Sequence, residues 1–242
     1  IAAGAVIGVI GIMALILIPL SGTSKNANKY PSREVTVAAS VSEEQSSDKS
    51  KASAAYSASF EVLIKEALGT SVSSVTEEEL GRFKYLSMRK GEAGWMITYS
   101  FENPIVAAEQ GQDADINVVV CQEALELQDI AALPQLEYLN LDHTELPEGS
   151  LETLSSLKMI TCDYIQLDML RLALGDAAKG LERLNASHLK SLEELSYFPG
   201  LKSLEMEDCR EISDISALAQ VKDLENLKLY DMDEVNDFTV LN

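Results

Sequence analysis

Two histidines and three cysteines are the side chains of this sequence best suited to chemistry. His143 and His188 each follow a strand-like apolar run, and neither belongs to a motif for nucleophilic catalysis. A catalytic nucleophile needs a base held against it. The sequence contains no G-x-S-x-G, no H-E-x-x-H and no glycine-rich phosphate loop. It therefore predicts a protein that is not an enzyme and that carries no cofactor.

The cysteines are odd in number and far apart. Cys121, Cys162 and Cys209 have no metal-ligand spacing to one another or to a histidine, and they imply no disulfide framework. We expect Cys162 and Cys209 to be buried thiols in the core. We expect Cys121 to point to the outer face of its strand.

Acidic residues dominate the charge. Nineteen Lys and Arg stand against 39 Asp and Glu, which gives a net charge of −20. Such a chain repels phosphate backbones, so nucleic acid is excluded as a partner. Calcium prefers carboxylate oxygens, but Asp142, Asp163 and Glu207 lie in separate strands without a loop motif. No metal site is therefore predicted.

The elements that position these residues repeat along the chain. Residues 130–146 read IAALPQLEYLNLDHTEL, in which apolar residues are first spaced by three and then by two. Spacing by three suits a segment that turns in toward a core, and spacing by two is that of a β-strand. The pattern L-x-x-L-x-x-L-x-L is the core of a leucine-rich repeat, which cannot bury its apolar face alone.

Copies of this unit flank it at steps of 20 to 24 residues. The inward strand positions are 118/120, 139/141, 160/162, 184/186, 204/206 and 227/229. A crossover signature recurs at residues 127–133, 212–218 and 235–241. The predicted fold is therefore an α/β solenoid, a leucine-rich-repeat horseshoe with a parallel concave β-sheet. The repeats are expected over residues 85–242, with an irregular insertion at 89–116.

The residues that alternate with the leucines should line the concave surface. They are Tyr138, Asn140, Asp142, Met159, Thr161, Asp163, Arg183, Asn185, Ser203, Glu205, Glu207, Asn226, Lys228 and Tyr230. Aromatic and polar side chains on a rigid platform suit recognition of a protein or peptide. The alternative is that these are merely solvated strand positions.

The first twenty residues have a different composition. Residues 1–20 contain no charged side chain and almost no polar one. A helix of this length, at about 1.5 Å per residue, crosses about 30 Å of hydrocarbon. We therefore predict a transmembrane helix. A cleaved signal peptide is the alternative, but its apolar region is shorter and ends at a small-residue cleavage site.

Residues 21–57 are rich in Ser, Ala, Lys and Glu and have few large apolar side chains. Such a segment cannot bury enough surface to fold, so it is predicted to be a flexible linker. A linker between a membrane helix and a folded module is typical of a surface-displayed domain. We therefore expect the protein to be membrane-anchored with its repeats outside the cytoplasm. Lys25, Lys29 and Arg33 favour the opposite placement.

Residues 58–84 have the features of a helical cap over the first edge of the repeats. Phe60, Leu63 and Ile64 have helical spacing. The T-E-E-E sequence at residues 76–79 is a capping box that opens a second short helix.

The pattern F-x-x-L-I-x-x-A-L-G from Phe60 and V-T-x-x-x-L-x-x-F-x-x-L-x-M from Val75 resembles the N-terminal cap of bacterial internalin-like leucine-rich-repeat proteins. The I-S-D-I-S-A-L crossover at 212–218 resembles the same group, whose repeats have about 22 residues. The resemblance covers residues 60–241. It implies this repeat fold and adhesion to a cell surface or another extracellular ligand.

The insertion at residues 89–116 departs from the repeat pattern. Residues 95–101 alternate in polarity and read as a strand. The G-E-A-G turn at residues 91–94 suggests a hairpin with residues 85–88. A divergent repeat with a long loop is the alternative.

The sequence as a whole predicts a membrane-tethered module that binds a protein or peptide through its concave face. Two other interpretations stay open. The repeats could be the sensor of a signalling protein whose effector precedes residue 1, which predicts a kinase-like or zinc-ribbon-like module there. They could also be a cytosolic scaffold, which the basic residues after the apolar segment favour.

Overall fold

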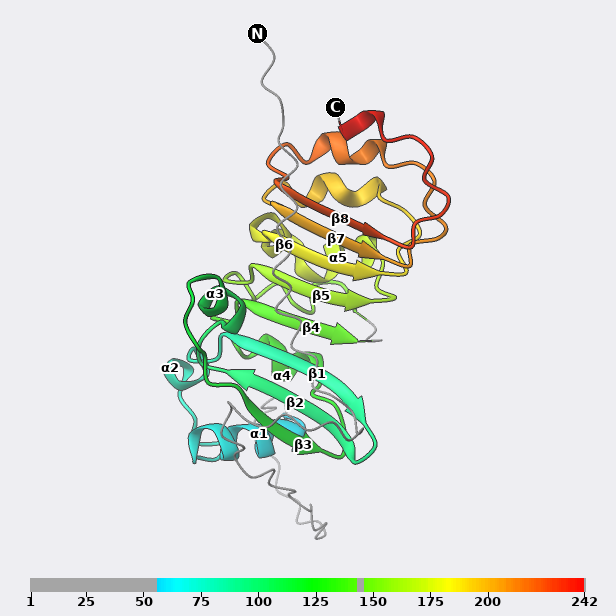
Figure 1. The fold of residues 1–242 in the computed structure, drawn as a ribbon. Helices are drawn as coiled ribbons and strands as arrows, with labels where there is room; N and C mark the ends of the chain where they lie inside the picture. The colour runs from blue at the N-terminus through cyan, green and yellow to red at the C-terminus, as the bar shows by residue number, and fades with distance from the viewer. Residues whose placement is uncertain (1–55, 143–145, 242) are drawn as a thin grey trace, which may run out of the picture. The chain divides into compact units, whose positions relative to one another are not determined.

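The computed structural model describes residues 56–142 and 146–241, and its strands form one mixed sheet (Figure 1). In chain order the strands are β1 (Tyr85–Gly91), β2 (Gly94–Ser100), β3 (Asn117–Cys121), β4 (Tyr138–Asp142), β5 (Met159–Asp163), β6 (Arg183–Ser187), β7 (Ser203–Glu207) and β8 (Asn226–Tyr230). Across the sheet their order is β3-β2-β1-β4-β5-β6-β7-β8.

Strands β4 to β8 are parallel and follow one another in chain order. Their leucine positions are in register: Leu139 lies beside Ile160, and Leu184 lies beside Leu204. These inward side chains are at most 1 % exposed. The five strands and their inward residues are those that the repeat spacing predicts. The mostly parallel sheet of a leucine-rich-repeat fold is therefore confirmed for this part of the chain.

The connections from β5 to β8 return over the same side of the sheet through short helices (Figure 1). Helix α5 (Leu167–Leu174) and the 3-10 helix η1 (Gly175–Gly180) join β5 to β6, η2 (Glu193–Tyr197) joins β6 to β7, and η3 (Ser216–Gln220) joins β7 to β8. Helix α4 (Leu127–Ala131) precedes β4, η4 (Thr239–Leu241) follows β8, and the described residues between β4 and β5 form turns without a helix. The leucines of these segments pack against the inward strand residues and form one continuous apolar core. The opposite side of the sheet, predicted to be concave, is called the outward face below.

The hairpin interpretation of the insertion is confirmed. Strands β1 and β2 are antiparallel, with Gly91 opposite Gly94 at the turn, and β1 pairs in parallel with β4. Gly94 has φ +132°, and a Cβ there would lie 2.3 Å from the carbonyl oxygen of Cys121. Only glycine fits this turn, because a side chain would both strain the backbone and clash with β3.

The place of β3 corrects one prediction. Positions 118/120 were expected to form a repeat strand next to β4, but β3 is the edge strand and is antiparallel to β2. Its inward residues are Val119 and Cys121, which are both 4 % exposed, whereas Val118 is 36 % exposed. The prediction that Cys121 faces outward is therefore wrong. Residues 118–121 are all apolar, so no alternation marks which set faces the core.

Two helices precede the sheet, as the sequence predicts. Helix α1 (Ala58–Leu68) buries Phe60, Leu63 and Ile64 completely and ends at Gly69, which has a left-handed backbone. Helix α2 (Glu77–Leu80) opens with a capping box between Thr76 and Glu79. Helix α1 packs against the edge strand β3 and the residues after it: the Cys121 thiol contacts the Ser59 carbonyl, and the Ser59 hydroxyl donates to the Glu123 carbonyl at 2.8 Å.

A fully buried carboxylate fixes the start of the folded body. The Asp129 side chain is 0 % exposed and accepts hydrogen bonds from the Ser57 amide at 3.1 Å and the Ser57 hydroxyl at 2.5 Å. It also accepts one from the Glu126 amide at 2.8 Å. Ser57 in turn caps α1 by accepting from the Phe60 amide at 3.1 Å. Ser57, which the sequence assigns to the linker, thus belongs to the folded body.

Charged residues directly precede six of the strands, and their sign alternates from one strand to the next across the sheet. Lysine or glutamate directly precedes each of β1, β4, β5, β6, β7 and β8: Lys84, Glu137, Lys158, Glu182, Lys202 and Glu225. Lys84 pairs with Glu137 at 3.3 Å, and Glu182 pairs with Lys158 at 3.4 Å and Lys202 at 2.9 Å. Opposite charges at neighbouring register positions favour the observed strand order.

The predicted transmembrane helix (residues 1–20) and all but the last two residues of the predicted linker (21–57) lie outside the described residues. Within the described part, no helix has the length and apolarity needed to cross a bilayer.

Candidate functional site

The predicted partner-binding residues, together with Tyr85, Ser87 and Ser187, stand in three rows on the outward face. The first row is Tyr85, Tyr138, Met159, Arg183, Ser203 and Asn226. The middle row is Ser87, Asn140, Thr161, Asn185, Glu205 and Lys228. The last row is Asp142, Asp163, Ser187, Glu207 and Tyr230. Parallel register therefore brings every predicted residue to one face, although neighbours in a row from β4 to β8 are 20 to 24 residues apart in sequence.

Two residues of the first row are buried and cannot contact a partner in this structure. Tyr138 is 8 % exposed and Met159 is 6 % exposed, although neither belongs to the leucine core. Helix α3 (Pro104–Glu109) lies at this end of the strands (Figure 1), where Glu109 forms an ion pair with Arg183, the register neighbour of Met159. Tyr138 and Met159 were expected to meet a partner, but they are buried in this structure. Helix α3 belongs to the insertion at residues 89–116, and the periodic spacing of the sequence does not predict that this segment contacts the outward face.

Burial also changes the pKa values of the two tyrosines at this end of the strands. The ring of Tyr85 stacks on that of Tyr138, with centroids 4.5 Å apart. Desolvation raises the pKa of Tyr85 to about 12 and raises the pKa of Tyr138. The Tyr138 hydroxyl donates to Thr161 Oγ1 at 3.1 Å. Both phenols are therefore neutral at physiological pH and act as packing groups.

The middle row is polar and open. Asn185 and Lys228 are exposed, and Asn140, Thr161 and Glu205 are half-buried. The Lys228 ammonium donates to Glu205 Oε2 at 3.0 Å. The row thus offers amide, hydroxyl and charged groups on strands that, from β1 to β7, are hydrogen-bonded on both edges.

The last row leads to a group built around Asp163. Its Oδ1 accepts a hydrogen bond from the Ser187 hydroxyl at 2.8 Å and lies 2.8 Å from His188 Nδ1. The Tyr164 ring stacks on the His188 imidazole, with centroids 3.9 Å apart and planes 12° from parallel. Tyr164 is 52 % exposed. A stacked pair of rings therefore lies just after the ends of β5 and β6, with the Asp163 carboxylate in contact with its imidazole.

Every parallel strand from β5 to β8 is directly followed by a residue with left-handed backbone. These residues are Tyr164, His188, Asp208 and Asp231, with φ between 50° and 59°. Their side chains form a rim along the strand ends, and three of their amides continue the ladder by donating to the next strand. Asp tolerates this conformation, but a bulky residue such as Tyr164 rarely adopts it. The rim was not predicted from the sequence, because each of its residues lies just outside the alternating pattern of its strand.

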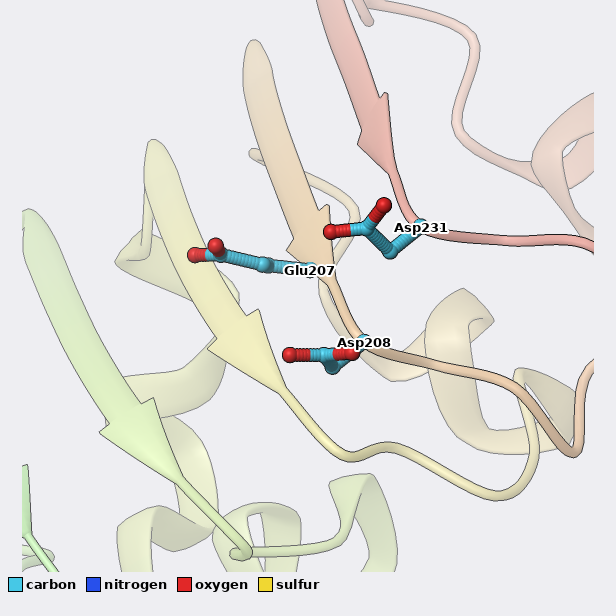
Figure 2. Close-up of side chains that lie close together, drawn as sticks. All are labelled: Glu207, Asp208 and Asp231. Carbon is cyan, nitrogen blue, oxygen red and sulfur yellow. The ribbon is translucent and has the colours of Figure 1, made fainter.

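Three carboxylates meet at the far end of the rim. Glu207, Asp208 and Asp231 each place an oxygen within 4.8 Å of the other two. Figure 2 shows Glu207 and Asp208 extending from the end of β7 toward β6, and Asp231 extending from the end of β8 toward β7. The Arg210 guanidinium already binds Asp208 Oδ1, at 2.6 Å from Nη2 and 3.0 Å from Nε. Calcium takes six to eight oxygen ligands, so three carboxylates shared with an arginine make a poor calcium site.

Two candidates from the sequence have no described side chain. Asp142 ends β4 in the last row, but its side chain and His143 lie outside the described residues. The calcium ligands considered from the sequence do not meet as a set: Asp163 binds Ser187 and His188, whereas Glu207 lies with Asp208 and Asp231.

The arrangement of serine, histidine and aspartate does not form a catalytic triad. Ser187 donates to Asp163 rather than to the imidazole of His188. Burial raises the pKa of the Cys162 thiol to about 12 and raises the pKa values of Cys121 and Cys209, so these thiols are poor nucleophiles. The absence of enzymatic activity stays a prediction.

Comparison with known proteins gives a partial structural likeness. A scan against protein-family models finds no matching family, and a search of curated proteins finds no match. Among solved structures, the chain is similar to internalin C2 from Listeria monocytogenes, with 23% identity and a TM-score of 0.35. The likeness covers 50% of this chain and 54% of that chain.

Proposed function

We propose that this protein is a membrane-tethered recognition module that binds a protein or peptide through the open part of the outward face. The observation that carries the proposal is the register of the middle and last rows. It places amide, hydroxyl, carboxylate and tyrosine groups from four repeats on one rigid surface.

The open part of the face is suited to binding because it is already ordered. Each of its strands from β5 to β7 is hydrogen-bonded on both edges, and the leucine core fixes the opposite side. Side chains on such a scaffold lose little further freedom when a partner binds, which lowers the entropic cost of association. Buried Tyr138 and Met159 stand outside the surface that we assign to the partner.

The membrane tether in this proposal is inferred from the amino-acid sequence. Residues 1–20 are the proposed membrane span, and the segment that follows them up to the folded body is the proposed linker, which would display the repeats outside the cytoplasm. Adhesion to a cell surface or to another extracellular ligand is the role that suits such a display.

Site-specific photocrosslinking tests the binding face. A benzophenone amino acid is placed at Asn185, at the centre of the open face, and at Gln220 on η3 as the control, since both positions are exposed. The proposal expects a discrete crosslinked partner from Asn185 on intact cells. An excess of unmodified protein should suppress this product, and an N185R/K228E variant should not.

Equal crosslinking from Gln220 and Asn185, or competition by the altered-face variant as strong as by the unmodified protein, would refute the assignment of the face. Protease shaving of intact cells that express the chain with a tag after Asn242 tests its placement. Release of the tagged body from sealed cells supports display outside. Release only after the membrane is opened refutes the surface role and favours a cytosolic scaffold.

A further inference from the structure

We infer that the first row of the outward face is a second binding surface, which helix α3 occupies while no partner is bound. The partner is a peptide segment with the chemistry of α3: an apolar side chain, followed two positions later by a carboxylate that pairs with Arg183. This inference goes beyond the proposed function, which uses only the middle and last rows.

The segment that contains α3 runs along the first row. It leaves the sheet at Ser100, the last residue of β2, and ends over β6, where Glu109 forms its ion pair with Arg183. Four strand spacings of about 4.8 Å separate β2 from β6. The register neighbours that lie between Ser100 and Arg183 are Tyr85, Tyr138 and Met159. Residues 101–109 therefore pass over these three side chains.

The burial of α3 agrees with this path. Ala107 is 8 % exposed, and like Tyr138 and Met159 it is buried without belonging to the leucine core. Figure 1 shows α3 at the starts of the strands, beside β4. Aromatic rings, methionine and arginine are enriched at the buried centres of protein interfaces. Helix α3 thus holds the place of a bound peptide and displays the chemistry that the row accepts.

The contact between α3 and the row is suited to displacement. The ion pair of Glu109 with Arg183 joins two partly exposed side chains, and such pairs contribute little stability. Among the described residues, it is the one side-chain polar contact between residues 104–112 and the parallel strands. A helix of six residues is also marginal by itself. The buried Asn103 side chain that caps it leaves Nδ2 without a hydrogen-bond partner in the described part of the chain.

The base of the segment is fixed, so α3 can leave the row without unfolding the sheet. The Ser100 hydroxyl donates to the Asp115 carbonyl at 2.7 Å and joins the two ends of the segment. The Phe101 ring lies 5.2 Å from that of Phe83, and Arg82 lies over it at 4.3 Å. Residues 102–114 therefore form a loop with tied ends, in which only α3 and its flanks need to move.

The test measures fluorescence anisotropy of a labelled peptide with the sequence of residues 102–112, ENPIVAAEQGQ, added to the full 242-residue chain in neutral detergent. In the unmodified chain, α3 competes with the peptide at a high effective concentration, so binding should be weak. Glu109→Lys faces Arg183 with a like charge and should strengthen peptide binding by about fivefold, the scale of one surface ion pair. A peptide with lysine in place of Glu109 should lose this gain.

Two further variants control for charge and for the ion pair. Asp113→Lys makes the same change of charge at an exposed position of the same segment, and it should bind the peptide as the unmodified chain does. The E109K/R183E variant restores the ion pair with reversed charges and should also bind weakly. Hydrogen exchange of residues 105–110 should rise by about fivefold in Glu109→Lys and return in E109K/R183E, whereas exchange in β4 and β5 stays unchanged.

Three results overturn the inference. Equal gains in Asp113→Lys and Glu109→Lys mean that only the added positive charge attracts the peptide. Unchanged exchange of residues 105–110 in Glu109→Lys means that the ion pair does not hold α3 on the row. Faster exchange without peptide binding means that the uncovered row is not a binding surface, and crosslinking from Asn185 would still support the proposed function in that case.

Discussion

The phenol rings of Tyr85 and Tyr138 stack with their centroids 4.5 Å apart and their planes 9° from parallel. They join the hairpin strand β1 to the first strand of the parallel series, β4, where the two residues are register neighbours. Stacked aromatic pairs add stabilisation beyond the area they bury. This contact lets a non-repeating hairpin serve as the first layer of the repeats.

Alkaline pH should destabilise this junction through Tyr85. Folding raises the pKa of Tyr85 from 10.0 to about 12 because the phenol is desolvated. The stability that this group contributes is therefore fully present below about pH 10 and is lost as the pH rises toward 12. Between pH 9 and pH 11, urea unfolding should show a smaller decrease in the free energy of unfolding for Tyr85→Phe than for the unmodified chain. Equal decreases would show that Tyr85 is not the group responsible.

Loss of the buried Asp129 carboxylate should detach the start of α1. Asp129→Ala leaves the Ser57 amide and hydroxyl without their buried acceptor. We expect the free energy of unfolding to fall by about 2–4 kcal/mol, with faster amide exchange in α1. The exposed control Asp113→Asn should change it by less than about 0.5 kcal/mol. Unchanged exchange in α1 would show that this carboxylate does not hold the helix.

Two glycines with positive φ should respond differently to alanine. Gly94→Ala places a Cβ 2.3 Å from the Cys121 carbonyl oxygen, whereas Gly111 has no atom within 4 Å of such a Cβ. Backbone strain alone should cost about 1–2 kcal/mol at Gly111. Gly94→Ala should cost at least about 1 kcal/mol more, because β2 and β3 must separate. Thermal unfolding midpoints measure the difference, and equal shifts would contradict the steric argument.

The alternating charges at the strand entries should matter only at low salt. Glu182 is half-exposed and binds both Lys158 and Lys202. Its hydrogen bond from Lys202 lowers the pKa of Glu182. The stability it contributes is thus present above about pH 4.3 and is lost as the pH falls through the lowered value. Glu182→Gln should cost less than about 1 kcal/mol, and 1 M salt should abolish the effect.

Charge reversal tests the same contacts. Glu182→Lys should destabilise the chain more than Glu182→Gln, because it faces Lys158 and Lys202 with a like charge. Adding Lys202→Glu should restore part of the loss. Urea unfolding at low and high salt measures both, and a double variant no more stable than Glu182→Lys alone would show that the pair does not interact.

The sequence by itself determined the strands whose residues alternate strictly. Leucines such as Leu139 and Leu184 fall at a fixed place in each repeat, and only one of the two strand faces is apolar there. Because the side-chain period of a strand is two, this pattern specifies both the register and the outward residues. The capping box at Thr76 was equally readable, since all its partners lie within four residues.

The tertiary structure decided what depends on contacts between distant segments. The run Val118–Cys121 is apolar on both faces, so only its packing against β2 and α1 determines which side is buried. The closure of the first row depends on Glu109 reaching Arg183, and the ring pair joins Tyr164 to His188, 24 residues later. Such contacts form only after the repeats have stacked, and no local spacing in the chain encodes them.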